Sequence, residues 1–172
     1  MQEPPPLILT LAFDEVTFAR FDGERRRHFP EALNHIPAHA TLFHHLPGDR
    51  ERAVLETITA LARTLPPPDV AVTGLRFIGR GVAYVLESEP LAMFRGRLAK
   101  EFIADLTAQD RQGWRPHVTV QNKVAPQVAR ALHESLQAGF EPFRFTTPAL
   151  LLWRYLGGPW GRVARIPFGD HA

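Results

Sequence analysis

Cysteine is absent from the 172-residue chain. Disulfide bonds, thiolate zinc sites, iron–sulfur clusters and a cysteine nucleophile are therefore excluded. The sequence also lacks the run of about eighteen apolar residues that a membrane helix needs, and its first residues, MQEPPP, are acidic and proline-rich rather than cationic. We therefore expect a soluble, unprocessed, cytoplasmic protein that does not contact membranes.

Lysine is scarce, with two residues against eighteen arginines, and the formal net charge is only +2. Arginine presents a planar fork that suits phosphate oxygens, but so small a net charge does not by itself indicate nucleic-acid binding. The phosphate-loop pattern G-x-x-x-x-G-K-[ST], the dinucleotide fingerprint G-x-G-x-x-G and the hydrolase elbow G-x-S-x-G are also missing. Nucleoside triphosphate, dinucleotide and serine hydrolase chemistry thus lack support.

Hydrophobic periodicity and turn residues predict an alternating α+β order of elements. The predicted helices, the first of them a short polar helix or turn, cover 18–29, 48–65, 90–106 and 126–137. The predicted strands cover 6–16, 36–46, a hairpin over 70–88, then 116–124, 143–156 and 162–168. Prolines 66–68 end the second helix, and the Gly-Arg-Gly sequence at 79–81 is typical of a hairpin turn.

A His-x-Thr pattern occurs twice, as HAT at 39–41 and HVT at 117–119, with the histidines 78 residues apart. A proline precedes each motif, and another opens the helix that follows it. We therefore expect an internal duplication. The chain would form a single bilobal domain over 1–172, with approximate halves 1–88 and 89–172 related by a pseudo-twofold axis.

Each motif is predicted to present its polar side chains on one face of a strand, because alternate side chains of a strand share a face. The two predicted cleft faces are His39, Thr41 and Phe43 on one strand, and His117, Thr119 and Gln121 on the other. The intervening apolar residues would anchor both strands in the core. The two histidines would then face each other across a cleft between the lobes.

Two histidines that face each other can divide acid–base catalysis between them. A neutral imidazole removes a proton while a protonated one delivers a proton to the leaving oxygen. Threonine hydroxyls can donate hydrogen bonds to the non-bridging oxygens of a phosphate as its charge grows. The paired motifs therefore predict a phosphodiester site without a metal, with a bell-shaped pH dependence whose limbs lie near neutrality.

Further side chains are candidates for substrate contacts. Phe43 would stack on a base and Gln121 would contact it through its amide, and Tyr155 would contact a phosphate or a base. Arg115 and Lys123 flank the second motif and would supply positive charge. Each of these residues can equally be structural or a solvated surface residue.

A metal cluster is the rival interpretation of the histidines around the first motif. His35, His44 and His45 lie close to His39 in the sequence, and histidine is a common metal ligand. No neighbouring Asp or Glu and no H-E-x-x-H pattern accompanies them. We therefore expect neither a metal nor any other cofactor.

The paired motifs, HATL and HVTV, resemble those of the 2H phosphoesterase superfamily, especially its bacterial 2′,5′-RNA-ligase-like branch. The resemblance covers nearly the whole chain, including the terminal segment LWRYLGGPWGRVARIPF. It implies an α+β, bilobal fold whose antiparallel sheets line a central cleft with the helices outside. It also implies catalytic roles for His39, Thr41, His117 and Thr119, acting without a metal on 2′,3′-cyclic phosphates or 2′,5′ linkages of RNA ends or nucleotides.

Two alternatives stay open at this point. The chain would be a non-catalytic nucleotide- or RNA-binding module if the cleft turned nothing over, or a 2H enzyme for another phosphodiester, such as a cyclic oligonucleotide. We expect a monomer. The sequence does not assign the base and the acid between the two histidines, because hydrolysis and ligation exchange these roles.

Overall fold

Residues 2–170, which the computed structural model describes, form eight strands, five α-helices and two short 3₁₀ helices. In chain order these are β1 (Leu7–Leu11), α1 (Glu15–His28), η1 (Glu31–Leu33), β2 (Thr41–Leu46), η2 (Gly48–Arg50), α2 (Glu51–Ala62), β3 (Asp69–Phe77), β4 (Val82–Glu87), α3 (Glu89–Glu101), α4 (Ala108–Arg111), β5 (His117–Gln121), α5 (Pro126–Gly139), β6 (Phe143–Thr146), β7 (Ala149–Tyr155) and β8 (Trp160–Pro167). None of the helices within residues 2–170 has the length and apolar character required to cross a bilayer.

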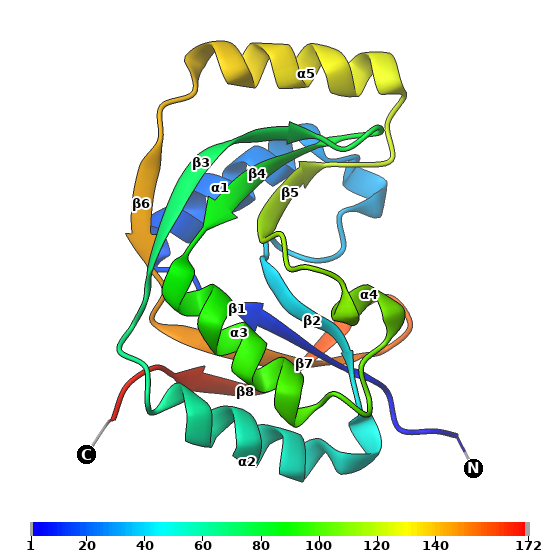
Figure 1. Cartoon of the computed structure of the whole chain (residues 1–172). Helices are drawn as coiled ribbons and strands as arrows, with labels where there is room; N and C mark the ends of the chain where they lie inside the picture. Colours follow the sequence, from blue (N-terminus) through cyan, green and yellow to red (C-terminus); the bar gives the residue numbers. More distant parts are fainter. Residues whose placement is uncertain (1, 171–172) are drawn as a thin grey trace.

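The strands form two four-stranded antiparallel sheets, with orders β2-β1-β7-β8 and β5-β4-β3-β6 (Figure 1). This arrangement confirms the predicted α+β, bilobal fold. The strands that carry the two motifs, β2 and β5, each lie at an edge of a sheet. β2 pairs with β1, and β5 pairs with β4. In each pair the chain forms helical structure between the two strands, with α1 after β1 and α3 after β4.

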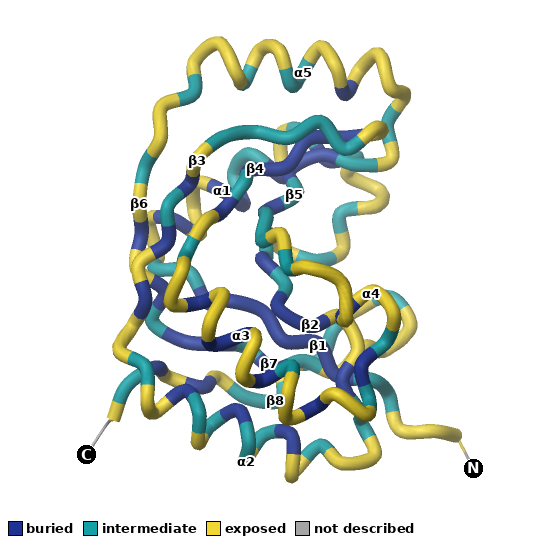
Figure 2. The backbone as a smooth tube through the Cα atoms, viewed as in Figure 1, coloured by how far each residue is buried: buried dark blue, intermediate teal, exposed yellow. Residues whose placement is uncertain are grey.

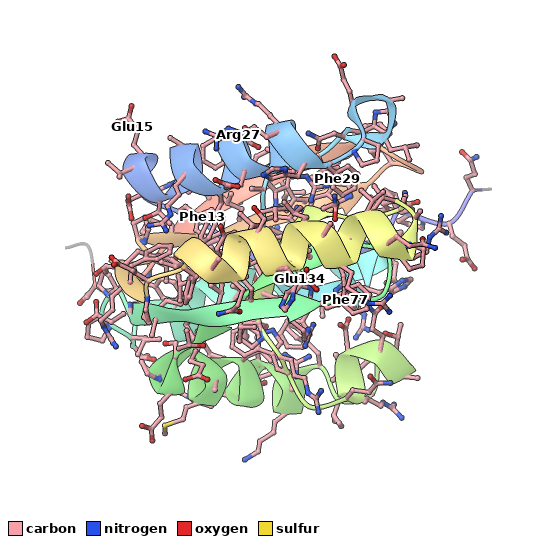
Figure 3. All side chains as sticks on the ribbon, turned by 90° about the horizontal axis from the view of Figure 1, so that it is seen from above. Phe13, Glu15, Arg27, Phe29, Phe77 and Glu134 are labelled. Carbon is pink, nitrogen blue, oxygen red and sulfur yellow. The ribbon has the colours of Figure 1, made fainter. Side chains whose placement is uncertain are left out.

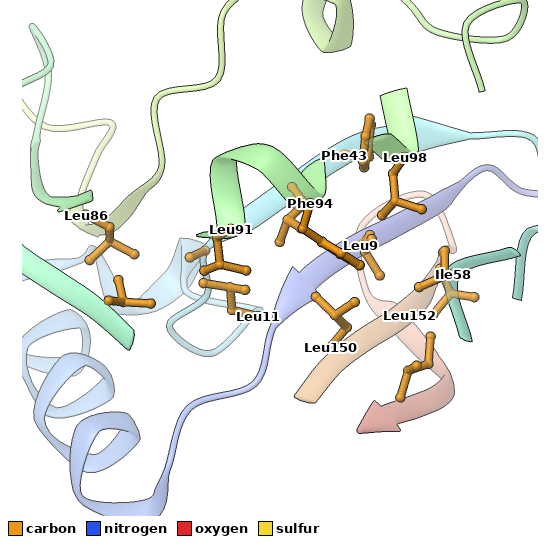
Figure 4. Close-up of a cluster of buried hydrophobic side chains, with 14 of the residues drawn as sticks. Leu9, Leu11, Phe43, Ile58, Leu86, Leu91, Phe94, Leu98, Leu150 and Leu152 are labelled. Atoms are coloured by element: carbon orange, nitrogen blue, oxygen red, sulfur yellow. The ribbon is translucent and has the colours of Figure 1, made fainter. Parts of the chain in front are cut away.

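The helices that connect these strand pairs are exchanged between the lobes. α1 leaves the sheet of β1 and β2 and packs on the other sheet, where the Phe21 ring lies 5.4 Å from Tyr84 and 5.9 Å from Phe143. α3 leaves β4 and packs against β1 and β7 (Figure 4), and its Phe94 ring lies 5.5 Å from Phe168. Since each sheet is covered by a helix from the other strand pair, the two lobes share one core.

The other two long helices cover the outside of the molecule. α2 buries Val54 and Ile58 beside the sheet that contains β8. α5 packs on β3, where the Phe77 ring lies 6.5 Å from the His133 ring, and Figure 3 shows α5 in front of this strand. β1 is buried along its whole length, whereas α5 is exposed along most of its surface (Figure 2).

A buried arginine on each exchanged helix binds the backbone of a motif strand. Arg95 of α3 donates from Nε to the carbonyl of Leu42 at 3.1 Å and from Nη2 to the carbonyl of Asp110 at 2.7 Å. Arg25 of α1 donates from Nη1 to the carbonyl of Thr119 at 2.9 Å. Both arginines are buried. An edge strand has backbone groups without a hydrogen-bond partner on a neighbouring strand. The two guanidinium groups donate hydrogen bonds to carbonyls of these edge strands.

The predicted strand over 143–156 is wrong, because the structure divides this segment between the two sheets. β6 pairs with β3, and β7 pairs with β1 and β8. Thr147 between them is buried, and its hydroxyl donates to the carbonyl of Ala12 at 2.7 Å. Pro148 has no N–H for a strand ladder. The chain therefore changes sheets at this pair of residues.

Other predicted elements are confirmed with shifted ends, notably the hairpin and the three later helices. The first helix is longer than the predicted polar turn, because Asp14 caps it by accepting from the N–H of Thr17 at 2.9 Å and from its hydroxyl at 2.7 Å. β2 begins only at Thr41, so His39 lies just before the strand. α4 was not predicted.

The order of elements repeats, as β1-α1-β2-α2 and again as β4-α3-β5-α5. Each sheet nevertheless takes two strands from 1–88 and two from 89–172. The lobes are therefore not the two predicted halves of the sequence. The internal duplication itself stays a prediction.

Replacing Arg95 by Met tests the importance of the buried bridge between α3 and β2. Methionine keeps much of the apolar bulk but leaves the carbonyls of Leu42 and Asp110, both in buried residues, without their donor. We expect the free energy of unfolding to fall by about 2 to 5 kcal/mol, since each unsatisfied buried group costs about 1–3 kcal/mol. Arg97→Met is the control on the same helix, because Arg97 is exposed, and should cost about 0.5 kcal/mol or less. Urea denaturation measures both values, and an equal loss of unfolding free energy in the two variants would contradict the assigned role of Arg95.

Candidate functional site

The two motif histidines are held by the same kind of hydrogen bond. The Nδ1 atom of His39 lies 2.9 Å from the carbonyl oxygen of Pro37, and that of His117 lies 2.8 Å from the carbonyl oxygen of Arg115. In both cases the carbonyl belongs to the residue two positions earlier. Since a carbonyl can only accept, Nδ1 carries the proton in each ring. The lone pair of the neutral imidazole is therefore on Nε2 in both histidines.

Burial and positive charge lower the pKa of both rings. Burial lowers the pKa of His39 to about 4, with further lowering by the charges of Arg25, His117 and His44. The pKa of His117 is lowered as well, again first by burial and then by Arg76 and His44. Both imidazoles are therefore neutral at pH 7 in the ligand-free protein. We therefore expect both limbs of the pH profile at lower pH than the sequence alone predicts.

A polar pocket of about 520 Å³ joins the two lobes at this point. Its lining includes Thr41 from the first motif and His117 from the second. Four further side chains that can carry positive charge, His44, Arg76, Arg95 and Arg115, also line it. The pocket thus brings a hydroxyl and an imidazole together with groups that can bind an anion.

An aromatic pocket of about 310 Å³ lies on the His39 side of the site. The Trp160 ring is 4.8 Å from the His39 ring, and Trp153 is 5.9 Å from Trp160. The Trp153 indole donates to the Thr10 hydroxyl at 3.0 Å, and the Arg162 guanidinium lies 4.7 Å above the Trp153 ring. Flat aromatic surfaces of this kind can stack on a nucleobase.

Local sequence explains how these aromatic side chains reach the site. β7 and β8 are joined by a tight turn in which the N–H of Leu156 donates to the carbonyl of Pro159 at 3.0 Å. Gly157 has a φ of 85°, which favours glycine. The turn places Trp160 opposite Tyr155 in the β7–β8 register. On the other side, the Trp114 indole donates to the carbonyl of Thr41 at 2.9 Å and links the two motif segments.

The structure divides three of the predicted catalytic residues between the two pockets. His39 lines the aromatic pocket, whereas Thr41 and His117 line the polar one. Thr119 is half-buried in β5, and its carbonyl accepts from Arg25. His39 and His117 are nevertheless close enough to interact electrostatically, since the charge of His117 contributes to the lowered pKa of His39.

Two predicted substrate contacts are corrected by their burial. Phe43 is fully buried in the core beside Phe102 and is not on the cleft face. The reason is that the β1–β2 register shifts on both sides of the Leu9–Phe43 pair, which interrupts the simple alternation of side chains. Gln121 is also buried, and among the described residues its Oε1 has no hydrogen-bond partner.

The third predicted contact, Tyr155, is exposed and lies at the rim. It lines a shallow pocket that also contains Trp160 and His44. Lys123 lies outside the pockets around the motifs, just beyond the end of β5, whereas Arg115 lines the polar pocket. The structure therefore keeps Tyr155 and Arg115 near the site and separates Phe43 and Gln121 from it.

Sequence reasoning missed two features of the site. The sequence includes Trp153 and Trp160 in its terminal segment but does not indicate that they reach the site, because their approach to His39 depends on the β7–β8 pairing. The partner of His44 is Asp110, 66 residues away in the sequence, so no local spacing indicates it. Within residues 2–170, no group of three His, Asp or Glu side chains is arranged to hold a metal ion.

Comparisons with known proteins agree with this geometry. The family model described as the 2'-5' RNA ligase superfamily matches residues 11–159. No curated protein sequence matches the chain. Among solved structures, TT0787 of Thermus thermophilus has a TM-score of 0.63 at 17% identity, with 96% of this chain and 100% of that chain covered. E. coli LigT complexed with 3'-AMP has a TM-score of 0.61 at 17% identity, with 98% of this chain and 100% of LigT covered.

The structural likeness supports the fold, and the sequence match supports the family. The match extends over both His-x-Thr motifs and includes Trp153. The chain therefore belongs to the 2'-5' RNA ligase superfamily, within the 2H phosphoesterases.

Proposed function

We propose that this protein is a metal-independent 2H-type phosphodiesterase that acts on 2′,3′-cyclic phosphate or 2′,5′-linked RNA and nucleotide substrates. The observation that carries the proposal is the matched pair of imidazoles. Both have Nδ1 bound to a backbone carbonyl and Nε2 available, and the charge of His117 lowers the pKa of His39. Acid–base catalysis of phosphodiester cleavage needs two such groups.

Structures of relatives support a phosphorylated nucleotide as ligand. E. coli LigT has been solved with 3'-AMP, with phosphate, with ATP and with NADP+. In the present chain, the polar pocket suits the phosphate and the aromatic pocket suits the base. A nucleotide or an RNA end with a terminal cyclic phosphate contains both groups.

The lower pKa suggests how the two histidines divide the work in hydrolysis. His39, whose pKa is about 4, acts as the base and takes a proton from the attacking water. The water oxygen forms a bond to phosphorus as the bond from phosphorus to one ribose oxygen breaks. His117 delivers its proton to that leaving oxygen. The anionic substrate helps His117 to hold this proton, because a nearby negative charge raises the pKa of an imidazole.

The threonines assist the same step through their hydroxyl groups. Thr41 and Thr119 donate hydrogen bonds to the non-bridging phosphate oxygens, whose negative charge increases in the transition state. In the reverse direction, a terminal hydroxyl replaces water as the nucleophile and the histidines exchange roles. The same four side chains therefore serve both hydrolysis and ligation.

Replacing His39 or His117 by Asn removes Nε2 but keeps an N–H donor for the backbone carbonyl, so the local fold is preserved. We expect turnover to fall about 100- to 10,000-fold in each variant, which is the usual contribution of one acid–base group. The assay follows an RNA with a 2′,3′-cyclic phosphate end in the presence of EDTA, with His45→Asn as control. A fully active His39→Asn variant would falsify the mechanism. Binding without turnover by the wild type would instead favour a binding module.

The pH dependence of kcat/KM should be a bell that lies below the ordinary histidine pKa of about 6.5. Activity is lost as the pH falls through about 4, where His39 gains a proton and stops acting as a base. It is lost on the alkaline side as His117 gives up its proton, and this pKa is lowered from its ordinary value. The measurement is initial rates at low substrate concentration between pH 3.5 and about 8. An alkaline limb above about pH 7 would contradict the assignment.

Replacing Trp160 by Leu should weaken nucleotide binding about tenfold, because stacking on one aromatic ring contributes about 1–3 kcal/mol per base. Trp160→Phe keeps an aromatic surface and should bind close to normally. Inorganic phosphate, which has no base, should bind both variants like the wild type. The measurement is calorimetry with a nucleoside 3′-phosphate and with phosphate. An equal loss of affinity for both ligands would show that Trp160 does not act through the base.

A further inference from the structure

A third histidine faces the cleft, although neither motif includes it. His44 lies three residues beyond Thr41 in β2 and lines the polar pocket together with Thr41 and His117. Its side chain is 43% exposed, so the ring can meet a ligand. Strict alternation from Thr41 would turn it to the opposite side, but the register shifts between β1 and β2 interrupt the alternation.

The His44 ring is fixed by a buried carboxylate. The Oδ1 atom of Asp110 lies 3.0 Å from Nδ1 of His44, and the carboxylate also accepts from the backbone N–H groups of His44 at 3.0 Å and His45 at 2.9 Å. The Asp110 side chain is only 1% exposed. Arg95 holds the backbone of Asp110 through its carbonyl. Asp110 is therefore held in place both through its side chain and through its backbone carbonyl.

Asp110 is ionised in this position. Burial alone would raise its pKa, but the hydrogen bonds from the His44 ring and from the two backbone N–H groups outweigh burial and lower the pKa. An ionised carboxylate against Nδ1 fixes the proton on that nitrogen and orients the ring. The second ring nitrogen, Nε2, is left for contact with the pocket.

His44 is also within electrostatic reach of both motif histidines. Its positive charge lowers the pKa of His39 and that of His117. An anion seated between those two rings would therefore be stabilised by the same charge. Arg76 and Arg115 line the same pocket, but among these three groups only His44 is bound to a buried carboxylate.

We propose that His44, oriented by Asp110, is a phosphate-binding residue of this cleft, in which Nε2 of the ring forms a hydrogen bond with a phosphate oxygen of the ligand. The identity of the natural substrate rests on the proposed function, but the binding of phosphate does not. Hydrogen bonds between charged donors and phosphate are about twice as strong as neutral ones. His44 therefore supplies binding of the charged group, while His39 and His117 move the protons.

If the role of His44 were purely structural, its contact with Asp110 would only attach α4 to β2. His44→Asn separates the two roles, because asparagine can still donate to Asp110 near the position of Nδ1 but has no atom at the position of Nε2. His45→Asn is the matched control. His45 is the next residue and gives its backbone N–H to the same carboxylate, but its side chain does not line the polar pocket.

The test is titration of inorganic phosphate into the wild type and both variants, followed by calorimetry and by NMR signals of the histidine rings. We expect His44→Asn to bind phosphate about tenfold more weakly, which corresponds to about 1.4 kcal/mol, and His45→Asn to bind like the wild type. Phosphate should also shift the His44 ring signals in the wild type. In turnover assays, His44→Asn should raise KM more than it lowers kcat, because a contact made before and during the reaction acts on binding.

Several results would overturn the proposal. These are unchanged affinity in His44→Asn, equal weakening in both variants, no saturable binding by the wild type, or phosphate binding that leaves the His44 ring signals unmoved. The last measurement needs no variant, so it decides the question even if His44→Asn fails to fold. Phosphate binding through His44 in a protein that cleaves no phosphodiester would reject the proposed function alone.

Discussion

The exchange of α1 and α3 between the lobes is the constraint on which the rest of the structure depends. Each helix connects two strands of one sheet but buries its apolar face on the other sheet. Neither sheet can therefore form its core without the other. Each helix also contributes one buried arginine, Arg25 or Arg95, to a carbonyl of an edge strand. Each exchanged helix thus holds one motif strand both by hydrophobic burial and by a hydrogen bond.

The site follows from this arrangement of edge strands. An edge strand leaves one side free of neighbouring strands, and in this protein that side faces the cleft between the lobes. Three histidines are presented there, and each is tethered through Nδ1, to a backbone carbonyl in His39 and His117 and to a carboxylate in His44. A carbonyl fixes the tautomer without adding a charge, whereas a carboxylate adds a negative charge beside the ring. The proposed division between proton transfer by His39 and His117 and phosphate binding by His44 follows this difference.

The two pockets differ in the chemistry of their lining side chains. Cationic side chains gather on the Thr41 and His117 side, and tryptophan rings gather on the His39 side. A nucleotide has the same division between a charged phosphate and a flat base. Because the His39 and Trp160 rings lie 4.8 Å apart, the surface proposed to bind the base directly adjoins a histidine proposed to react.

The sequence by itself determined the α+β order of elements, the two His-x-Thr strands and the family. These properties depend on local periodicity and on short motifs. Only the tertiary structure decided that Phe43 is core, that the 143–156 segment changes sheets at Pro148, and that Asp110 lies against His44. Each of these outcomes depends on a register shift or on a contact between residues far apart in the chain. Local patterns do not contain that information, because the packing of the whole core sets the register and brings such residues together.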